Sequence, residues 1–417
     1  MEILVFIAII AGVYMAWNIG ANDVANSMAD AVGSKAITIF WAVVLAGICE
    51  FCGAVLVGSH VTDTVRKGII DTEFFTENPR LLAHGMFCAM LAAGVWLNIA
   101  SYFGMPVSTT HSIVGAIVGF GILEAGWGNV EWWMMGKIVS SWFISPVAGG
   151  IMAFIFFKLI SRFILTAKQP GVAARKGVPI CTFFTFAIII LATIYKGLKG
   201  VKWLHLDFPQ ALGLCILGGL VAAIVARLLI KRSSYCSDKV SFDEQLDQVE
   251  KVFGILVIIT SCTVAFAHGA NDVANAIGPL AAVVSIVEMN AIPAKVGVPM
   301  WVLYLGGGGI VLGLATFGYR VMRKVGTQVT EITPSRGVAA DLGATITVLT
   351  CSRLKLPIST THTLVGAIIG VGLARGITAI NRKTVKSIFT SWIATVPIAA
   401  GLTVIFYLIG KQLFWSA

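Results

Sequence analysis

The same seven residues, GANDVAN, occur twice in this sequence, at 20–26 and again at 269–275. Each copy places a carboxylate inside an apolar stretch, which is costly, so its default interpretation is functional, although polar groups also pack helices together in membranes. The glycine weakens a helix and frees backbone carbonyl groups. Such oxygen ligands suit a hard cation, and we expect no histidine or cysteine beside them, which disfavours a transition metal. We therefore predict that a cation, preferably sodium, is bound by Asn22, Asp23, Asn271 and Asp272.

A second repeated motif, P-[VI]-S-T-T-H, begins at Pro106 and at Pro357. Proline, then hydroxyl residues, then an unbroken apolar run is typical of a helix N-terminus with its caps. The unpaired N–H groups and the positive end of the helix dipole attract anions. Capping alone explains the serine but not the two threonines that follow it in both copies. We predict that a tetrahedral oxyanion is bound by Ser108, Thr109, Thr110, Ser359, Thr360 and Thr361.

No basic residue lies within any of these four motifs, so the bound anion would lack a positive partner. Arg353 and Lys355 precede only the second hydroxyl motif. An uncompensated anion in a low-dielectric site is untenable, and cations held by the aspartates would offset its charge. The motifs therefore favour obligatory co-transport of a cation with an anion over a channel.

Two further acids, Glu50 and Asp341, lie inside apolar runs. Such carboxylates are candidates for an additional cation or proton site, the alternative being a paired structural role. His111 and His362 each end a hydroxyl motif, and each either carries a proton or is hydrogen-bonded within its own half-helix. No nucleophile–base pair is predicted, because adjacent residues on a helix do not face each other. We therefore predict no catalytic residues.

The composition is that of a membrane protein. Of the 417 residues, 57% are hydrophobic and 12% are charged, and the mean hydropathy is +0.89, whereas soluble domains carry about 25% charged residues. The net charge of +10 comes from basic residues clustered in loops between apolar runs. That pattern is typical of the positive-inside bias and does not indicate nucleic-acid binding.

Long apolar blocks predict membrane helices at about 3–17, 36–59, 81–103, 132–160, 251–267, 272–288, 297–319, 337–354, 359–374 and 385–410. Two shorter pieces, 24–33 and 108–123, predict half-helices, because a full span needs about 20 apolar residues. A further helical hairpin is predicted at 180–195 and 208–230. We therefore predict an all-α integral membrane protein with discontinuous or re-entrant half-helices and about 10–12 transmembrane segments.

The two halves of the chain are copies of each other. Residues 106–119 match 357–370 at ten of fourteen positions, at an offset of 251 (357 minus 106). The GANDVAN copies are offset by 249 (269 minus 20). Three regions follow: a first repeat at 1–160, a central hairpin with linkers at 161–250, and a second repeat at 251–417.

Loop charge predicts that the repeats have opposite orientations. The stretch 158–176 is basic without an acid, which places it in the cytoplasm and the acidic loop 124–131 outside. The counterpart of that outer loop, 375–386, carries four basic residues and is therefore expected in the cytoplasm. Equivalent loops on opposite sides predict inverted-topology repeats, with the binding site at their interface.

The paired GANDVAN and P-[VI]-S-T-T-H motifs resemble those of the inorganic phosphate transporter family, over nearly the whole chain. The resemblance implies phosphate as the substrate, sodium or protons as the driving ion, and a homodimer. It assigns cation binding to the asparagine–aspartate pairs, phosphate binding to the Ser-Thr-Thr triplets, and family acids to the positions of Glu50 and Asp341. Asp341 departs from the glutamate expected there. The short central segment favours a compact prokaryotic form in the cytoplasmic membrane.

The first interpretation is thus a sodium-driven phosphate symporter that works by alternating access. Within the same family, a proton-coupled metal-phosphate permease or a sulfate permease is the alternative. A membrane-embedded enzyme would need a nucleophile and base or a metal triad, which the sequence does not offer. Sodium ions, phosphate, the lipid bilayer and a second copy of the chain are the predicted partners, and no cofactor is predicted.

Overall fold

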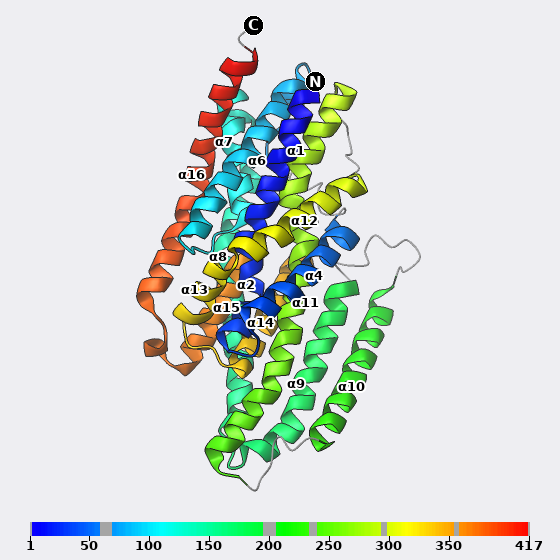
Figure 1. Cartoon of the computed structure of the whole chain (residues 1–417), viewed down its shortest axis with the longest axis vertical. Coiled ribbons are helices and arrows are strands. Elements are labelled where there is room, and N and C mark those ends of the chain that lie inside the picture. Colours follow the sequence, from blue (N-terminus) through cyan, green and yellow to red (C-terminus); the bar gives the residue numbers. More distant parts are fainter. Residues whose placement is uncertain are drawn as a thin grey trace.

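The computed structural model describes residues 2–58, 69–194, 206–232, 240–292, 298–353 and 358–415. These residues form helices throughout and no strand (Figure 1). Nine of the described helices are long and apolar enough to cross a membrane. The chain is therefore an all-α integral membrane protein, as predicted. Lys355 and Pro357, named in the sequence analysis, lie outside the described residues.

The first half follows the predicted blocks closely. Its principal elements are α1 (Glu2–Ile19), η1 (Gly20–Val24), α2 (Ala25–Ser27), α3 (Ala29–Gly33), α4 (Ile39–Val57), α6 (Pro79–Tyr102), α7 (Thr109–Glu124) and α8 (Trp132–Ile160), with single turns η3 (Glu73–Phe75), η4 (Trp127–Asn129) and η5 (Ser161–Leu165). The first GANDVAN copy is a buried π-helical turn followed by two short helical pieces. The predicted interruption at this copy is therefore a change to a π-helical turn and not the end of the helix, which continues to Ser27, whereas the predicted half-helix α7 is confirmed.

The second half comprises α11 (Phe242–Met289), α12 (Met300–Phe317), α13 (Tyr319–Gln328), α14 (Pro334–Arg353), α15 (Thr360–Arg375), η7 (Ile377–Ala379) and α16 (Arg382–Trp415). The predicted interruption between 267 and 272 is wrong, because α11 runs unbroken through the second GANDVAN copy for 48 residues. Gly269 serves close packing instead: a Cβ on it would lie 2.3 Å from the carbonyl oxygen of Glu50 in α4. This glycine therefore brings two helices together and does not end one.

The predicted central hairpin is present as α9 (Pro170–Ala192) and α10 (Phe208–Arg232), which lie side by side at the edge of the bundle (Figure 1). The next helix, α11, begins with a capping box in which Ser241 and Glu244 bond to each other's backbone N–H groups. Because α11 begins at Phe242, the predicted boundary between residues 250 and 251 falls inside this helix.

Each half-helix packs against a long helix of the other half of the chain, at equivalent positions. The half-helix α7 packs on α16, and the half-helix α15 packs on α8. A Cβ on Gly119 would lie 2.6 Å from the carbonyl oxygen of Ala400, and one on Gly370 would lie 2.0 Å from that of Gly150. These residues correspond at offsets of 251 (370 minus 119) and 250 (400 minus 150). The internal sequence duplication therefore has a structural counterpart, because equivalent residues of the two halves make equivalent contacts between helix backbones.

The C-terminal ends of the two half-helices lie at opposite ends of α16. Glu124, at the end of α7, contacts Lys411 near the end of α16 at 3.1 Å. Arg375, at the end of α15, is followed after one short turn by Arg382, where α16 begins. Lys411 follows Arg382 by 29 positions (411 minus 382), which corresponds to about 44 Å of helix. The equivalent loops 125–131 and 376–381 therefore lie far apart along the bundle (Figure 1).

The π-helical turn η1 and the end of α1 pack closely against α12. A Cβ on Gly313 would lie 1.7 Å from the carbonyl oxygen of Trp17, and one on Gly20 would lie 1.8 Å from that of Ile310. We expect Gly313→Ala to destabilise the fold by about 1–3 kcal/mol through overpacking, which a lower thermal unfolding temperature in detergent would reveal. Gly308→Ala on the same helix is the control, because its Cβ would meet nothing within 4 Å. Equal unfolding temperatures for the two variants would contradict this prediction.

Candidate functional site

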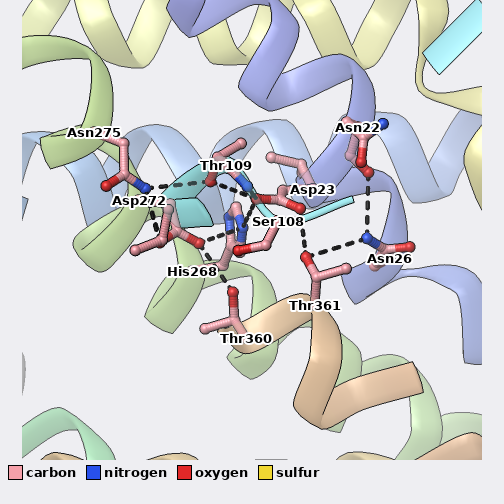
Figure 2. A network of polar contacts seen from close by, with 12 residues as sticks. Asn22, Asp23, Asn26, Ser108, Thr109, His268, Asp272, Asn275, Thr360 and Thr361 are labelled. Carbon is pink, nitrogen blue, oxygen red and sulfur yellow. Dashed lines mark hydrogen bonds and ion pairs between the residues drawn. The ribbon is translucent and has the colours of Figure 1, made fainter. Parts of the chain in front are cut away.

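Asp23, in the π-helical turn η1, joins the two half-helices. Its Oδ2 accepts hydrogen bonds from the Thr109 hydroxyl at 2.6 Å and from the Thr109 N–H at 3.2 Å. Its Oδ1 accepts a short hydrogen bond from the Thr361 hydroxyl. The aspartate is 2% exposed, so these bonds lie in the protein interior. One predicted cation ligand therefore binds the N-terminal turns of both predicted anion sites (Figure 2).

Asp272, in α11, occupies the equivalent place in the second repeat. Its Oδ2 accepts a hydrogen bond from the Thr360 hydroxyl at 3.0 Å, and its Oδ1 accepts one from Asn271 at 2.9 Å. Asn275 donates to the hydroxyl of Thr110 at 3.2 Å, across the interface between the repeats. Asn26 donates to the Thr361 hydroxyl at 3.5 Å in the same way. Both asparagines belong to the GANDVAN motifs, although they were not among the predicted site residues.

His268 lies at the centre of the cluster, and sequence reasoning missed it (Figure 2). Its Nε2 lies 2.6 Å from Asp272 and 3.9 Å from Asp23, and its Nδ1 lies 3.1 Å from Glu50. The expectation that no histidine stands beside the aspartates is therefore wrong. The sequence feature that could have identified His268 is its position directly before the second GANDVAN copy, where the first copy has the apolar Ile19.

The contacts of His268 require a dissociable proton in the cluster. A neutral imidazole carries one N–H group and one acceptor nitrogen, yet each ring nitrogen here lies against a carboxylate. Either the imidazole is doubly protonated, or one of the acids keeps its proton. Glu50 and His268 are 0% and 3% exposed, so neither charge is solvated by bulk water. The cluster therefore combines three acids with one base inside the membrane bundle.

Asn22 holds the segment that leads into α7. Its side-chain oxygen accepts from the Val107 N–H at 3.0 Å, and its amide donates to the Met105 carbonyl at 2.9 Å and to Ser101 at 3.1 Å. The side chain thus positions the hydroxyl motif relative to Asp23. Its predicted role as a cation ligand remains a prediction, as does that of the half-buried Asn271.

The serines of the hydroxyl motifs cap their own helices. Ser108 accepts from the His111 N–H at 3.3 Å, and Ser359 accepts from the His362 N–H at 3.2 Å. Beyond the caps, the rings of His111 and His362 meet edge to face at 4.4 Å, and His362 stacks on Trp392 at 3.7 Å. These histidines therefore pack against each other where the two half-helices meet.

The second additional acid, Asp341, lies apart from the central cluster. It is completely buried in α14 and accepts hydrogen bonds from Thr260 at 2.6 Å and from Ser261 at 2.9 Å. Of the two acids predicted together, the structure brings only Glu50 to the site.

Both aspartates and two of the threonines are buried, whereas Thr110, Asn271 and Thr360 are half-buried. Asp23, Asp272, Thr109 and Thr361 are each 2% exposed or less. An open pocket of about 440 Å³ reaches Met105, whose carbonyl group holds Asn22. Its lining residues are Trp96, Met105, Lys383, Lys386, Ser387, Thr390, Ser391 and Ala394. Two basic and three hydroxyl side chains therefore face an open cavity directly behind the segment that begins α7.

Carboxylates, amides and hydroxyls from the two GANDVAN copies and the two half-helices meet in the interior of the helical bundle. Such a site is characteristic of membrane transport proteins. The model of the phosphate transporter family matches residues 19–403, which is most of the chain. The chain belongs to the phosphate transporter family and is not an enzyme.

Relatives match over nearly the whole of this chain. A protein of Pyrococcus abyssi, named only as a candidate phosphate permease, is 47% identical, and the match covers 98% of both chains. The chloroplastic inorganic phosphate transporter 2-1 of Arabidopsis thaliana is 43% identical over 97% of this chain and 72% of its own. A solved structure described as the sodium-dependent phosphate transporter has a TM-score of 0.88 and 42% identity, covering 99% of this chain and 100% of its own.

Proposed function

We propose that this protein imports inorganic phosphate together with a cation, preferably sodium, by alternating access. The observation that carries the proposal is the bonding between the two predicted ligand sets. Thr109 and Thr361 donate to Asp23, and Thr360 donates to Asp272. Cation ligands and anion ligands thus share one buried site, which is the arrangement that coupling between the two ions requires.

This bonding also suggests an order of binding. A threonine hydroxyl has one proton to donate, and these three hydroxyls give it to carboxylates. A cation that binds the aspartates would compete for the same carboxylate oxygens and release the hydroxyl protons towards an anion. It would also offset the charge of the phosphate, which an uncompensated low-dielectric site would reject. We therefore propose that the cation binds before phosphate.

Two features support alternating access between inverted repeats. The half-helices α7 and α15 begin at the same buried cluster and end at opposite ends of α16. Each of these half-helices packs on a helix of the other repeat, and glycines at equivalent positions make the close contacts. A site enclosed between two related halves can open to either side as one half moves against the other.

Uptake of radiolabelled phosphate into proteoliposomes tests the proposed coupling. An inward sodium gradient is expected to accelerate uptake, whereas a proton gradient of equal size without sodium gives a smaller effect. Unlabelled sulfate is expected to compete weakly compared with unlabelled phosphate. The symport proposal fails if neither gradient accelerates uptake.

Loss of the threonine hydroxyls is expected to weaken phosphate binding more than cation binding. Thr109→Val combined with Thr360→Val removes two donors while keeping the side-chain shape. Each lost hydrogen bond to a charged ligand corresponds to about 1.5–3 kcal/mol, so the phosphate KM at saturating sodium should rise at least tenfold. The sodium dependence should change less. Thr350→Val is the control, because Thr350 is exposed and bonds only within its own helix.

A proton-coupled metal-phosphate permease is the second candidate, and His268 favours it. Ligand atoms of Asp23, His268 and Asp272 lie within 4.8 Å of one another, as the ligands of one metal ion would. Imidazole nitrogen is a common ligand for transition metals but not for sodium. Uptake that stops on chelation of divalent metals and persists without sodium would establish this candidate in place of sodium symport.

The homodimer and the cytoplasmic membrane of a prokaryote remain part of the proposal. Exposed apolar side chains cover α8, α10 and α16, where lipid or a second copy would contact them. The molar mass of the purified protein in detergent, measured by light scattering and corrected for bound detergent, would distinguish a monomer from a dimer.

A further inference from the structure

A second pair of acids meets deep in the bundle, away from the central cluster. Asp30 in α3 and Asp341 in α14 are both 0% exposed, and their carboxyl groups lie within hydrogen-bonding reach of each other. A Cβ on Gly337, one turn before Asp341, would lie 3.2 Å from the Cβ of Asp30. Both acids are therefore held against each other by tight packing between α3 and α14.

The carboxyl group of Asp30 has no other polar partner among the described residues. Neither of its oxygens, nor Oδ1 of Asp341, has a hydrogen-bond partner when both acids are treated as ionised acceptors. Oδ2 of Asp341 accepts from Thr260 and Ser261. These donors stabilise a negative charge on Asp341, whereas nothing stabilises one on Asp30.

No described basic group compensates the pair. The ion pairs of the described residues do not include Asp30 or Asp341. On α11 the thiol of Cys262 follows Ser261, Glu250 bonds to Ser335, and Arg336 on α14 pairs with Glu331 instead. Two ionised carboxylates in contact, buried and without a cation, repel each other strongly. A proton between them removes the repulsion and supplies the missing donor for Asp30.

We propose that Asp30 and Asp341 form a proton-binding site, in which protonated Asp30 donates a hydrogen bond to ionised Asp341. The pair is distinct from the central cluster, whichever ion drives transport there. Asp30 follows Asp23 by seven residues, and Ser261 precedes His268 by seven, so about 10 Å of helix separates the two sites along α11. Loss of the proton would drive α3 away from α14, and α3 continues from the turn that holds Asp23.

Infrared spectroscopy of the purified full-length protein tests the site directly, since a protonated carboxyl group absorbs apart from a carboxylate. Asp30→Asn keeps the shape and can still donate to Asp341. We expect Asp30→Asn to remove one carboxylic-acid band, which titrates away as the pH is raised in wild-type protein. Asp341→Asn should shift that band rather than remove it, because the buried Asp30 keeps its proton but loses its ionised acceptor. Asp243→Asn, exposed at the start of α11, should remove none. If Asp30→Asn leaves every carboxylic-acid band of the wild type in place, or if sodium abolishes the Asp30 band at constant pH, the proposal is overturned.

Thermal unfolding provides a second readout that does not depend on transport. Because the folded pair keeps a proton that exposed aspartates lose at lower pH, its stabilisation is present at low pH and disappears as the pH rises through its titration. The unfolding temperature of the wild type should therefore fall relative to that of Asp30→Asn over this range. Parallel curves for the two proteins would also contradict a shared proton.

Discussion

Asp23→Asn is expected to raise the sodium concentration for half-maximal phosphate uptake by about 10–100-fold. The substitution removes the negative charge from a side chain that bonds to both half-helices. Interactions with a charged group contribute about 1.5–3 kcal/mol, and each 1.4 kcal/mol is a factor of about ten in an equilibrium constant. Phosphate affinity at saturating sodium should change less, because the threonine hydroxyls remain.

The measurement is initial uptake into proteoliposomes over a range of sodium concentrations, at fixed and saturating phosphate. Asp243→Asn is the matched control, since it removes one carboxylate from an exposed position on the helix that carries Asp272. An unchanged sodium dependence in Asp23→Asn would show that the GANDVAN aspartates do not bind the coupling ion.

His268→Gln is expected to lower stability more than any other single change in the cluster. It leaves Glu50 and Asp272, both 1% exposed or less, without their basic partner. Breaking a buried ion pair by removing one partner costs about 3–5 kcal/mol, most of it from the charge left behind. The thermal unfolding temperature in detergent should therefore fall sharply.

The double variant with Glu50→Gln identifies the cause. If the loss comes from an uncompensated carboxylate, Glu50→Gln should restore part of the stability of His268→Gln, so that the two effects are not additive. His362→Gln is the control for loss of a buried imidazole, because His362 packs against aromatic rings. Glu50→Gln should not improve that variant. Additive effects in the first pair would rule out charge compensation by His268.

The helical segments could be predicted because they depend on local properties of the chain. The first half follows its apolar blocks to within a few residues, and α7 and α15 begin at the threonines that follow their serine caps. Motif duplication at one offset also indicated that the two halves would contribute equivalent residues. Asp23 and Asp272, Thr109 and Thr360 do meet in one cluster.

The continuity of α11 could not be predicted, because identical motifs have different surroundings. At Gly20 the backbone of α12 approaches a turn that is already irregular, whereas at Gly269 the backbone of α4 approaches a regular helix. The glycine propensity is the same in both places. The motif residues alone therefore do not distinguish the π-helical copy from the α-helical one.

The sequence by itself determined the membrane class, the duplication and the types of ligand atoms, since composition, periodicity and repeated motifs are properties of the chain alone. Only the tertiary structure decided which ligands share a site. His268 reaches three acids, the threonines of the anion motifs bind the aspartates of the cation motifs, and Asp30 meets Asp341 rather than the central cluster. These contacts join residues far apart in the chain, and the depth and rotation of each packed helix determine them.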